Sequence, residues 1–142
     1  AQFARVRLLN IGEEEQKGNL LTQAAYALMK DTKEYNFCGN IEANHLYDDM
    51  ADVIVCDGFT GNIVLKQVET MYTISQKLKL TNEFFDYFNY EIHGGTAVLG
   101  VNAPIVIGHG ASSALAIKNM VLQTEKLVSS KLTEKIKSAF QQ

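Results

Sequence analysis

The sequence lacks the features that mark several large classes of protein. Its only two cysteines, Cys38 and Cys56, lie far apart and have no C-x-x-C or Cys/His spacing. Neither a zinc site nor a disulfide framework is predicted, and both thiols are expected to be reduced and buried. The formal net charge is −3 and no basic run is present, so nothing indicates a nucleic-acid partner.

Long hydrophobic runs are also missing. No apolar stretch approaches the roughly 18 residues that suggest a membrane span, and the start of the chain has no signal-peptide pattern. A cytoplasmic protein is therefore expected. The chain has no initiator Met and enters an apolar segment almost at once, so it is expected to begin partway through a larger protein.

What is present is an ordinary globular composition with alternating strand and helix patterns. The 142 residues, 46% of them hydrophobic, predict one domain spanning 1–142 with a sizeable core. Expected strands are Val6–Ile11, Tyr35–Cys38 and Val53–Cys56, with Gly39-Asn40 as a turn that ends the second of them. Thr96–Val101 and Pro104–Gly110 are expected to form two close strands or one broken strand. Helices are expected from Asn19, which is placed to cap its helix, from Asn62, within Asn82–Tyr90, and from Ala111 onward to the C-terminus. Continuous apolar strands alternating with helices favour an α/β layer fold with a largely parallel sheet covered on both faces.

Three glycine-containing loops connect an expected strand to an expected helix: NIGEEEQKGN (10–19), CDGFTGN (56–62) and GHGASS (108–113). Ligands of such sheets gather at the carboxyl ends of the strands, and free N–H groups at a helix start favour an anion. The loops together predict a phosphate or oxyanion site. The candidate phosphate-binding residues are Asn10, Gly12, Gly18, Asn19, Gly58, Thr60, Gly61 and Ser112. None of the loops has the G-x-x-x-x-G-K-[ST] or G-x-G-x-x-G pattern of nucleotide sites.

These same segments carry a resemblance to a known family. LLNIGEE, KGN, NFCGNIE, ADVIVCDGFTGNIVLK, Gly94-Gly95 and GHGASSALAIKN together resemble the C-terminal part of the acyl-acyl carrier protein:phosphate acyltransferases, the PlsX family of bacterial phospholipid synthesis. The resemblance implies a three-layer α/β sandwich related to isocitrate and isopropylmalate dehydrogenases. It implies conversion of acyl-acyl carrier protein and inorganic phosphate to acyl phosphate without a cofactor or metal. A homodimer with peripheral contact at the inner membrane surface is also implied.

The chain departs from this family in two ways. Family members are more than twice as long, and their glycine-rich N-terminal half is absent here. The segment between the DGFTGN helix and Gly94 is also shorter than in the family. The missing stretch is expected at a junction near Leu78 to Leu80. An alternative is therefore a catalytically incompetent fragment that binds anions weakly. A decarboxylating dehydrogenase-like domain is disfavoured, because the sequence shows no clustered Asp pair for a metal and no dinucleotide fingerprint.

The resemblance assigns roles to four candidate catalytic residues. Phosphate itself is the nucleophile, so the protein must hold a dianion against a thioester carbonyl and stabilise the oxyanion. Lys17 is the first candidate ligand, or else a solvated loop lysine. Asn62 donates to phosphate or caps its helix. Asp57 orients Lys17, His109 or loop amides, or accepts in an Asx-turn. His109, near Ser112, protonates the departing thiolate or contacts the carbonyl oxygen, or is structural.

For the remaining polar groups, a structural or solvent-exposed role is weighed against a functional one. Cys56 closes an apolar strand and is expected to be buried rather than nucleophilic. Glu13, Glu14 and Glu15 are expected in an exposed loop rather than a metal site. Lysines of the last helix could contact an acidic carrier protein, although a solvated face explains them equally well. These lysines are Lys126, Lys131, Lys135 and Lys137.

Overall fold

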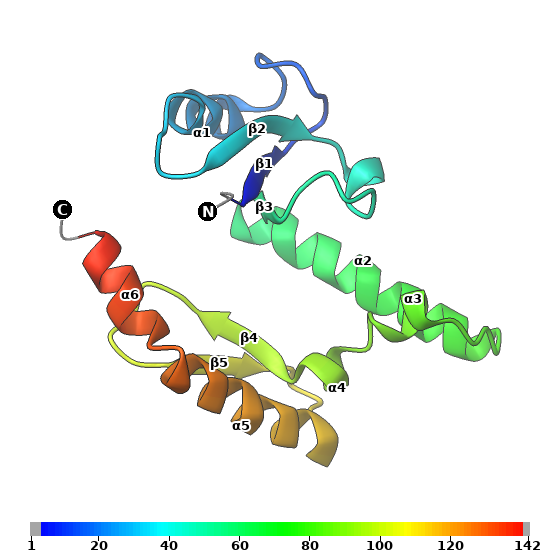
Figure 1. Cartoon of the computed structure of the whole chain (residues 1–142). Helices are drawn as coiled ribbons and strands as arrows, with labels where there is room; N and C mark the ends of the chain where they lie inside the picture. The colour runs from blue at the N-terminus through cyan, green and yellow to red at the C-terminus, as the bar shows by residue number, and fades with distance from the viewer. Residues whose placement is uncertain (1–3, 141–142) are drawn as a thin grey trace. The chain divides into compact units, whose positions relative to one another are not determined.

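The computed structural model describes residues 4–140. The chain divides into two compact units, one up to Ile63 and one from Val64 onward. Each unit is described by itself, and Figure 1 labels the elements of both.

The first unit contains a three-stranded parallel sheet in the order β2-β1-β3 (Figure 1). Its elements are β1 (Arg5–Leu9), α1 (Leu20–Lys30), β2 (Asn36–Ile41), the 3-10 helix η1 (Ala43–His45) and β3 (Val53–Val55). The predicted parallel α/β arrangement is confirmed for these three strands. The two crossover connections each return the chain to the same end of the sheet, as parallel pairing requires.

Strand β2 differs from the prediction that Gly39-Asn40 would end it. The strand continues to Ile41, and its pairing with β1 shifts register between Val6 and Leu8. Gly39 has a φ of 84° at this irregularity, a conformation that a side chain would disfavour. The glycine therefore produces a bulge within the strand instead of a turn after it.

Helix α1 covers the sheet through a small apolar core. Val6, Leu8 and Met29 are buried together, and the ring of Tyr26 packs edge-on against Phe37 with centroids 5.2 Å apart. The Asn19 side chain accepts a hydrogen bond from the Thr22 N–H at 3.0 Å, so the predicted cap of this helix is confirmed.

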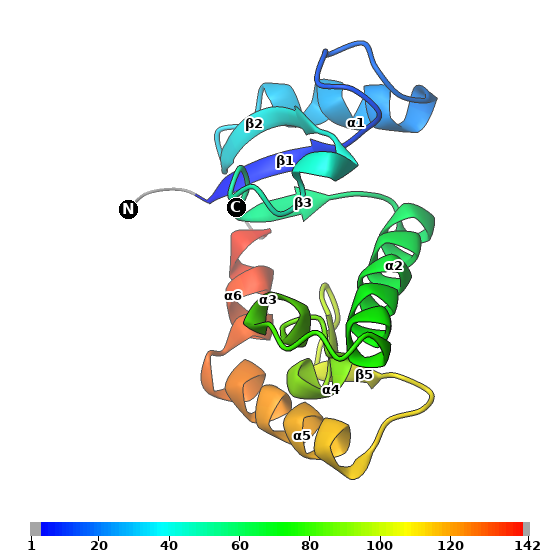
Figure 2. The same ribbon diagram turned by 90° about the vertical axis from the view of Figure 1, so that its right-hand side faces the viewer.

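The second unit pairs two antiparallel strands with a long helix. Helix α2 (Gly58–Lys77) leads into it, followed by α3 (Glu83–Asp86), α4 (Tyr90–His93), β4 (Gly95–Val98), β5 (Ile105–Gly108), α5 (Ala114–Ser129) and α6 (Leu132–Ala139). Strands β4 and β5 are antiparallel, and α5 packs along them (Figures 1 and 2). A Cβ on Gly108 would lie 2.6 Å from the Met120 sulfur, so the glycine permits this close packing.

The C-terminal region is two helices rather than the one helix predicted from Ala111 onward. Helix α5 ends at Ser129, and Lys131 takes a left-handed conformation with a φ of 54° before α6 begins. A left-handed residue cannot continue a right-handed helix, so the chain changes direction here.

An ion pair fixes the start of β1 and gives a testable pH dependence. The Arg5 guanidinium lies 2.9 Å from both Asp49 Oδ1 and Asp52 Oδ1, and the Arg5 N–H donates to Asp52 Oδ2 at 2.7 Å. These hydrogen bonds lower the pKa of Asp52 from 3.8 to about 2. Because the folded pKa is depressed, the stabilisation is present above about pH 4 and is lost as the pH falls toward 2.

We expect the free energy of unfolding to depend less steeply on pH in Asp52→Asn than in the parent chain over this acid range. Urea denaturation at several acidic pH values measures it. The exposed Glu34, replaced by Gln, is the control and should retain the parent slope. Equal slopes in Asp52→Asn and the parent chain would contradict the stabilising role of this pair.

Candidate functional site

Two of the three predicted anion-binding loops leave the parallel sheet at one edge. Strand β1 lies between β2 and β3, and all three run in the same direction. The loop at 10–19 follows β1, and the chain from Cys56 to Gly58 follows β3, as Figure 2 shows. Adjacent parallel strands thus bring both loops to their shared carboxyl end, which is where α/β sheets bind ligands.

Two buried asparagines hold the loop at 10–19 in shape. Asn10 donates from Nδ2 to the Lys17 carbonyl oxygen at 3.0 Å and to Asn40 Oδ1 at 3.2 Å. Asn40, whose residue is only 1% exposed, donates from Nδ2 to the Glu14 carbonyl oxygen at 2.9 Å. The two amides therefore fix the loop backbone at Glu14, within the acidic run, and at Lys17, just after it. The sequence analysis included Asn10 but missed Asn40, because a turn was expected there.

The glycines of this loop let it fold closely on itself. Gly18 has a φ of 91°, and a Cβ there would collide with Thr22 Oγ1 and Asn10 Oδ1. A Cβ on Gly12 would lie 2.8 Å from Lys17 Cγ. Gly12 is thus enclosed by side chains of the loop, and Gly18 by the loop and the first turn of α1. By contrast, a Cβ on Gly58 would meet no atom within 4 Å.

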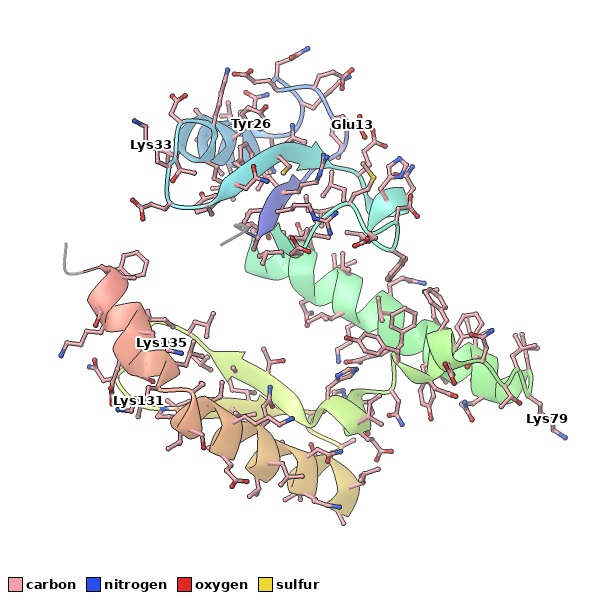
Figure 3. The ribbon with its side chains drawn as sticks, in the orientation of Figure 1. Glu13, Tyr26, Lys33, Lys79, Lys131 and Lys135 are labelled. Atoms are coloured by element: carbon pink, nitrogen blue, oxygen red, sulfur yellow. The ribbon has the colours of Figure 1, made fainter. Side chains whose placement is uncertain are left out.

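Lys17 presents its ammonium group from this fixed backbone. The side chain is 45% exposed, and Nζ lies 3.9 Å from Glu14 Oε1, at the outer limit of an ion pair. The neighbouring Glu13 lies in the same loop after β1 (Figure 3). Because the pairing of Lys17 is loose, its ammonium is accessible to an anion in solution.

Asp57, not Asn62, caps helix α2. Asp57 Oδ1 accepts from the N–H groups of Phe59 at 2.9 Å and Thr60 at 3.0 Å, and Oδ2 accepts from Thr60 Oγ1 at 2.6 Å. The helix begins at Gly58, so the prediction that Asn62 opens it is wrong. An Asp carboxylate that accepts two backbone N–H groups satisfies the helix start better than a residue one turn later. The hydrogen bonds from Thr60 lower the pKa of Asp57, which stays ionised.

Two further expectations for this region are settled by the same geometry. The Asx-turn interpretation of Asp57 is confirmed by its bonds to the following N–H groups. Asn62 is an exposed residue within the helix and does not cap it. Gly61 lies under the Cys56 sulfur, where a Cβ would be 3.1 Å from Sγ.

The two cysteines are not both buried as predicted. Cys56 is exposed and Cys38 is half-buried. Partial desolvation and the charge of Asp57 raise the pKa of the Cys56 thiol. A raised pKa keeps the thiol protonated near neutral pH, which agrees with the expectation that Cys56 is not a nucleophile.

His109 lies in the second unit, in a cluster with residues that the sequence analysis did not select. Its Nδ1 accepts from the Ala111 N–H at 3.2 Å, and its Nε2 lies 3.1 Å from Lys66 Nζ. Lys66 Nζ also lies 2.8 Å from Glu69 Oε2. The Tyr90 ring stacks on the imidazole with centroids 4.7 Å apart. Lys66 and Glu69 have ordinary helix-surface spacing in the sequence, so no local signal indicates them.

Ser112 stabilises the loop after β5 that carries His109. Its hydroxyl donates to the His109 carbonyl oxygen at 2.5 Å, and the neighbouring Ser113 caps α5 by accepting from the Ala116 N–H.

Among residues 4–140, no group of three or more His, Cys, Asp or Glu side chains is placed to hold a metal ion. Within those residues, every helix is too short or too polar to cross a membrane.

A protein-family model described as "Fatty acid synthesis protein" matches residues 1–79, more than half of the chain. The chain belongs to this fatty acid synthesis family. The matched region contains both loops at the carboxyl edge of the parallel sheet, with Asn10, Lys17, Asn40 and Asp57. It ends before His109.

Curated proteins similar to this chain carry the name phosphate acyltransferase. The protein from Listeria innocua is 41% identical over 153 residues, covering 94% of this chain and 45% of its own length. The Geobacillus protein is 39% identical over 157 residues, covering 97% and 47%, and the Dictyoglomus turgidum protein is 38% identical over 151 residues, covering 93% and 45%. The chain thus spans about half the length of these relatives.

The alignments are longer than the chain itself. Matches of 151–157 residues against a chain of 142 mean that the relatives carry residues inside the aligned region that this family member lacks. This agrees with the predicted shortening of the chain relative to the family.

Proposed function

We propose that this chain is the C-terminal portion of a phosphate acyltransferase that converts acyl-acyl carrier protein and inorganic phosphate to acyl phosphate. One observation carries the proposal. The buried Asn10 and Asn40 amides fix a loop that presents Lys17 at the same sheet edge as the Asp57 loop, in a chain about 40% identical to proteins named phosphate acyltransferase.

The chemistry required of such a site suits these groups. A phosphate oxygen attacks the thioester carbonyl carbon and forms a C–O bond, while the carbonyl π electrons move to the carbonyl oxygen. Return of that electron pair expels the carrier thiolate with the electrons of the C–S bond. The Lys17 ammonium offsets part of the charge of the phosphate dianion and holds it for attack.

The contacts divide the candidate catalytic and phosphate-binding residues of the first unit into two kinds. Asn10, Asn19, Asp57 and Thr60 use their side chains for loop and helix bonds. We assign them to positioning rather than direct contact. Direct contact is assigned to Lys17, the exposed Asn62 amide and the backbone at the open Gly58.

The finer features implied by the family resemblance form part of the proposal. They are a three-layer sandwich of the isocitrate and isopropylmalate dehydrogenase kind, a cytoplasmic homodimer, acyl carrier protein as partner, and peripheral contact with the inner membrane surface. The parallel β2-β1-β3 sheet and the family match support the first of these most directly. A catalytically incompetent fragment is the alternative, because the chain spans about half of its relatives.

The test is acyl phosphate formation by the purified chain supplied with acyl-acyl carrier protein and inorganic phosphate. Lys17→Met is expected to lower the rate by about 10- to 100-fold, since a charged hydrogen bond is worth about 1.5–3 kcal/mol. Lys33→Met is the matched control: Lys33 lies beyond the other end of α1 (Figure 3), and its rate should stay within about twofold.

Two outcomes would contradict parts of the proposal. A parent chain that forms no acyl phosphate indicates the incompetent fragment. A near-normal rate in Lys17→Met removes Lys17 from the site while leaving the activity itself in place.

A further inference from the structure

Helix α1 carries a second apolar face in addition to the one that packs on the sheet. Five apolar side chains make up this outer stripe, and all of them are exposed: Leu20, Leu21, Ala24, Ala27 and Leu28. We propose that the outer stripe binds the hydrocarbon chain of the acyl substrate, an inference that rests on the proposed function. The acyl head group lies at the Lys17 end of the helix, and the chain runs along α1 toward Leu28.

The outer stripe is separate from the side of α1 that faces the core. At about 100° per residue, its five side chains fall within an arc of about 120° around the helix. The inner side carries the buried Met29 and Tyr26, whose ring packs against Phe37 (Figure 3). A surface helix normally has polar side chains opposite its core. Because α1 has apolar side chains there, its outer side has the composition of a covered surface.

The leucines of the outer stripe make little contact with the rest of the described chain. Leu20 is 85% exposed, Leu28 is 82% exposed and Leu21 is 61% exposed. Single apolar side chains are ordinary on a protein surface, whereas a contiguous apolar patch marks a place where a ligand or partner binds. The outer stripe is contiguous, since its members recur at the three- and four-residue steps of one helix face.

The outer stripe begins beside the candidate phosphate site. Only two residues separate Lys17 from Leu20. The loop that carries Lys17 also presents Ile11, which is 81% exposed. A phosphate held by the Lys17 ammonium therefore has apolar side chains near it in the loop and at the start of the helix. An acyl phosphate needs this combination, because its anionic head and its hydrocarbon chain are joined.

The length and charge of α1 suit a hydrocarbon chain. Residues 20–29 contain no charged side chain. The eight residues from Leu20 to Leu28 span about 12 Å of helix, so the outer stripe offers an extended apolar path and not a single contact. The match to the fatty acid synthesis family, over residues 1–79, includes the whole of α1.

Charge favours an acyl chain over a membrane surface as the occupant. Glu13, Glu14 and Glu15 are exposed in the loop that leads to the outer stripe. An anionic bilayer would bring many negative head groups over these carboxylates, and like charges repel. A single acyl substrate brings one anionic head, and Lys17 is close in sequence to pair with it.

The test is an NMR measurement on the full chain with carbon-13 in its leucine methyl groups. The probe is stearic acid with a nitroxide at carbon 5 or carbon 16, below its micelle concentration, and its carboxylate stands in for the acyl phosphate head. The nitroxide at carbon 5 should broaden the methyl signals of Leu20 and Leu21 most, and the nitroxide at carbon 16 those of Leu28. Leu99, which is 63% exposed after β4, should be unaffected by either probe.

A pair of matched variants tests the contribution of the outer stripe to affinity. Leu28→Gln should raise the Kd of the stearic acid probe about fivefold, because part of the apolar contact with the chain is lost. Leu99→Gln is the control and should leave the Kd within about twofold. Both leucines are exposed, so neither substitution is expected to unfold the chain.

Several results would overturn the inference. These are broadening centred on leucines outside α1, the same broadening pattern for both nitroxide positions, and equal Kd values for Leu28→Gln and Leu99→Gln. Sedimentation velocity without probe gives one more: a dimer that Leu28→Gln converts to a monomer would show that a second copy of the chain covers the outer stripe.

The outcomes also separate this inference from the proposed function. A chain that forms acyl phosphate while its α1 methyl signals are unchanged by both probes keeps the proposed function and overturns the role of the outer stripe. A chain that forms no acyl phosphate but shows the expected order of broadening keeps the acyl-binding role of α1, and only the catalytic step is contradicted.

Discussion

Gly18→Ala is expected to lower the free energy of unfolding by about 2–6 kcal/mol. Two costs combine. The backbone φ of 91° lies in the left-handed region, where a residue with a side chain is strained by about 1–3 kcal/mol. The new methyl group also collides with Thr22 Oγ1 and Asn10 Oδ1, and overpacking of this kind typically costs about 1–3 kcal/mol. Urea denaturation of the full chain measures the sum.

Gly100→Ala is the matched control for the backbone contribution. Gly100 has a φ of 77°, but a Cβ there would meet no atom within 4 Å. Its cost should be about 1–2 kcal/mol, from strain alone. Adding Thr22→Ala to Gly18→Ala should recover part of the loss by removing one of the two collisions. Equal costs for Gly18→Ala and Gly100→Ala would show that the loop has room for a methyl group and is not held as described.

Asn40→Ala should destabilise the chain by about 2–4 kcal/mol and lower any acyl phosphate formation further. The substitution removes the hydrogen bond from Asn40 Nδ2 to the Glu14 carbonyl oxygen and the one from Asn10 Nδ2 to Asn40 Oδ1. Each lost hydrogen bond costs about 0.5–1.5 kcal/mol, and the space left at a position only 1% exposed adds to this cost. Since Asn40 also steadies Asn10, the backbone that carries Lys17 becomes less fixed, and a misplaced ammonium holds phosphate less well.

Asn36→Ala is the control, with the same substitution in the same strand. Asn36 is exposed at the start of β2, so its loss should change the free energy of unfolding by no more than about 0.5 kcal/mol. In the folded population, Asn40→Ala should raise KM for phosphate more than Asn36→Ala does. If the two variants were equally stable and equally active, the buried amide pair would have no part in shaping the site.

The sequence was most informative where the structure depends on neighbours along the chain. The Asn19 cap, the apolar strands of the parallel sheet and the loops after β1 and β3 all follow from contacts over a few residues or from a simple period. The family resemblance came from the same loops, since DGFTGN and KGN are short and specific. The family match confirmed it.

Several local predictions were wrong because two signals competed within a few residues. Asp57 and Asn62 are both good capping residues, and Asp57 comes first along the chain, so it starts α2. Gly39-Asn40 is an ordinary turn pair, but pairing with β1 continues the strand through it with a bulge. Residue types alone did not distinguish the two possible helix starts, or a turn from a continued strand. The hydrogen bonds of Asp57 determined the first, and the pairing of β2 with β1 determined the second.

What the sequence by itself determined was the family, the parallel α/β character of the first unit, and the loop that bears Lys17. Only the tertiary structure showed that Asn40 supports this loop from 26 residues away, and that Lys66 and Glu69 surround His109 from 43 and 40 residues away. The reason is physical: a cap or a glycine turn acts through adjacent backbone groups, which a sequence displays directly. A buried amide pair or an ammonium beside an imidazole depends on strand register and helix packing, and these arise only when distant segments are brought together.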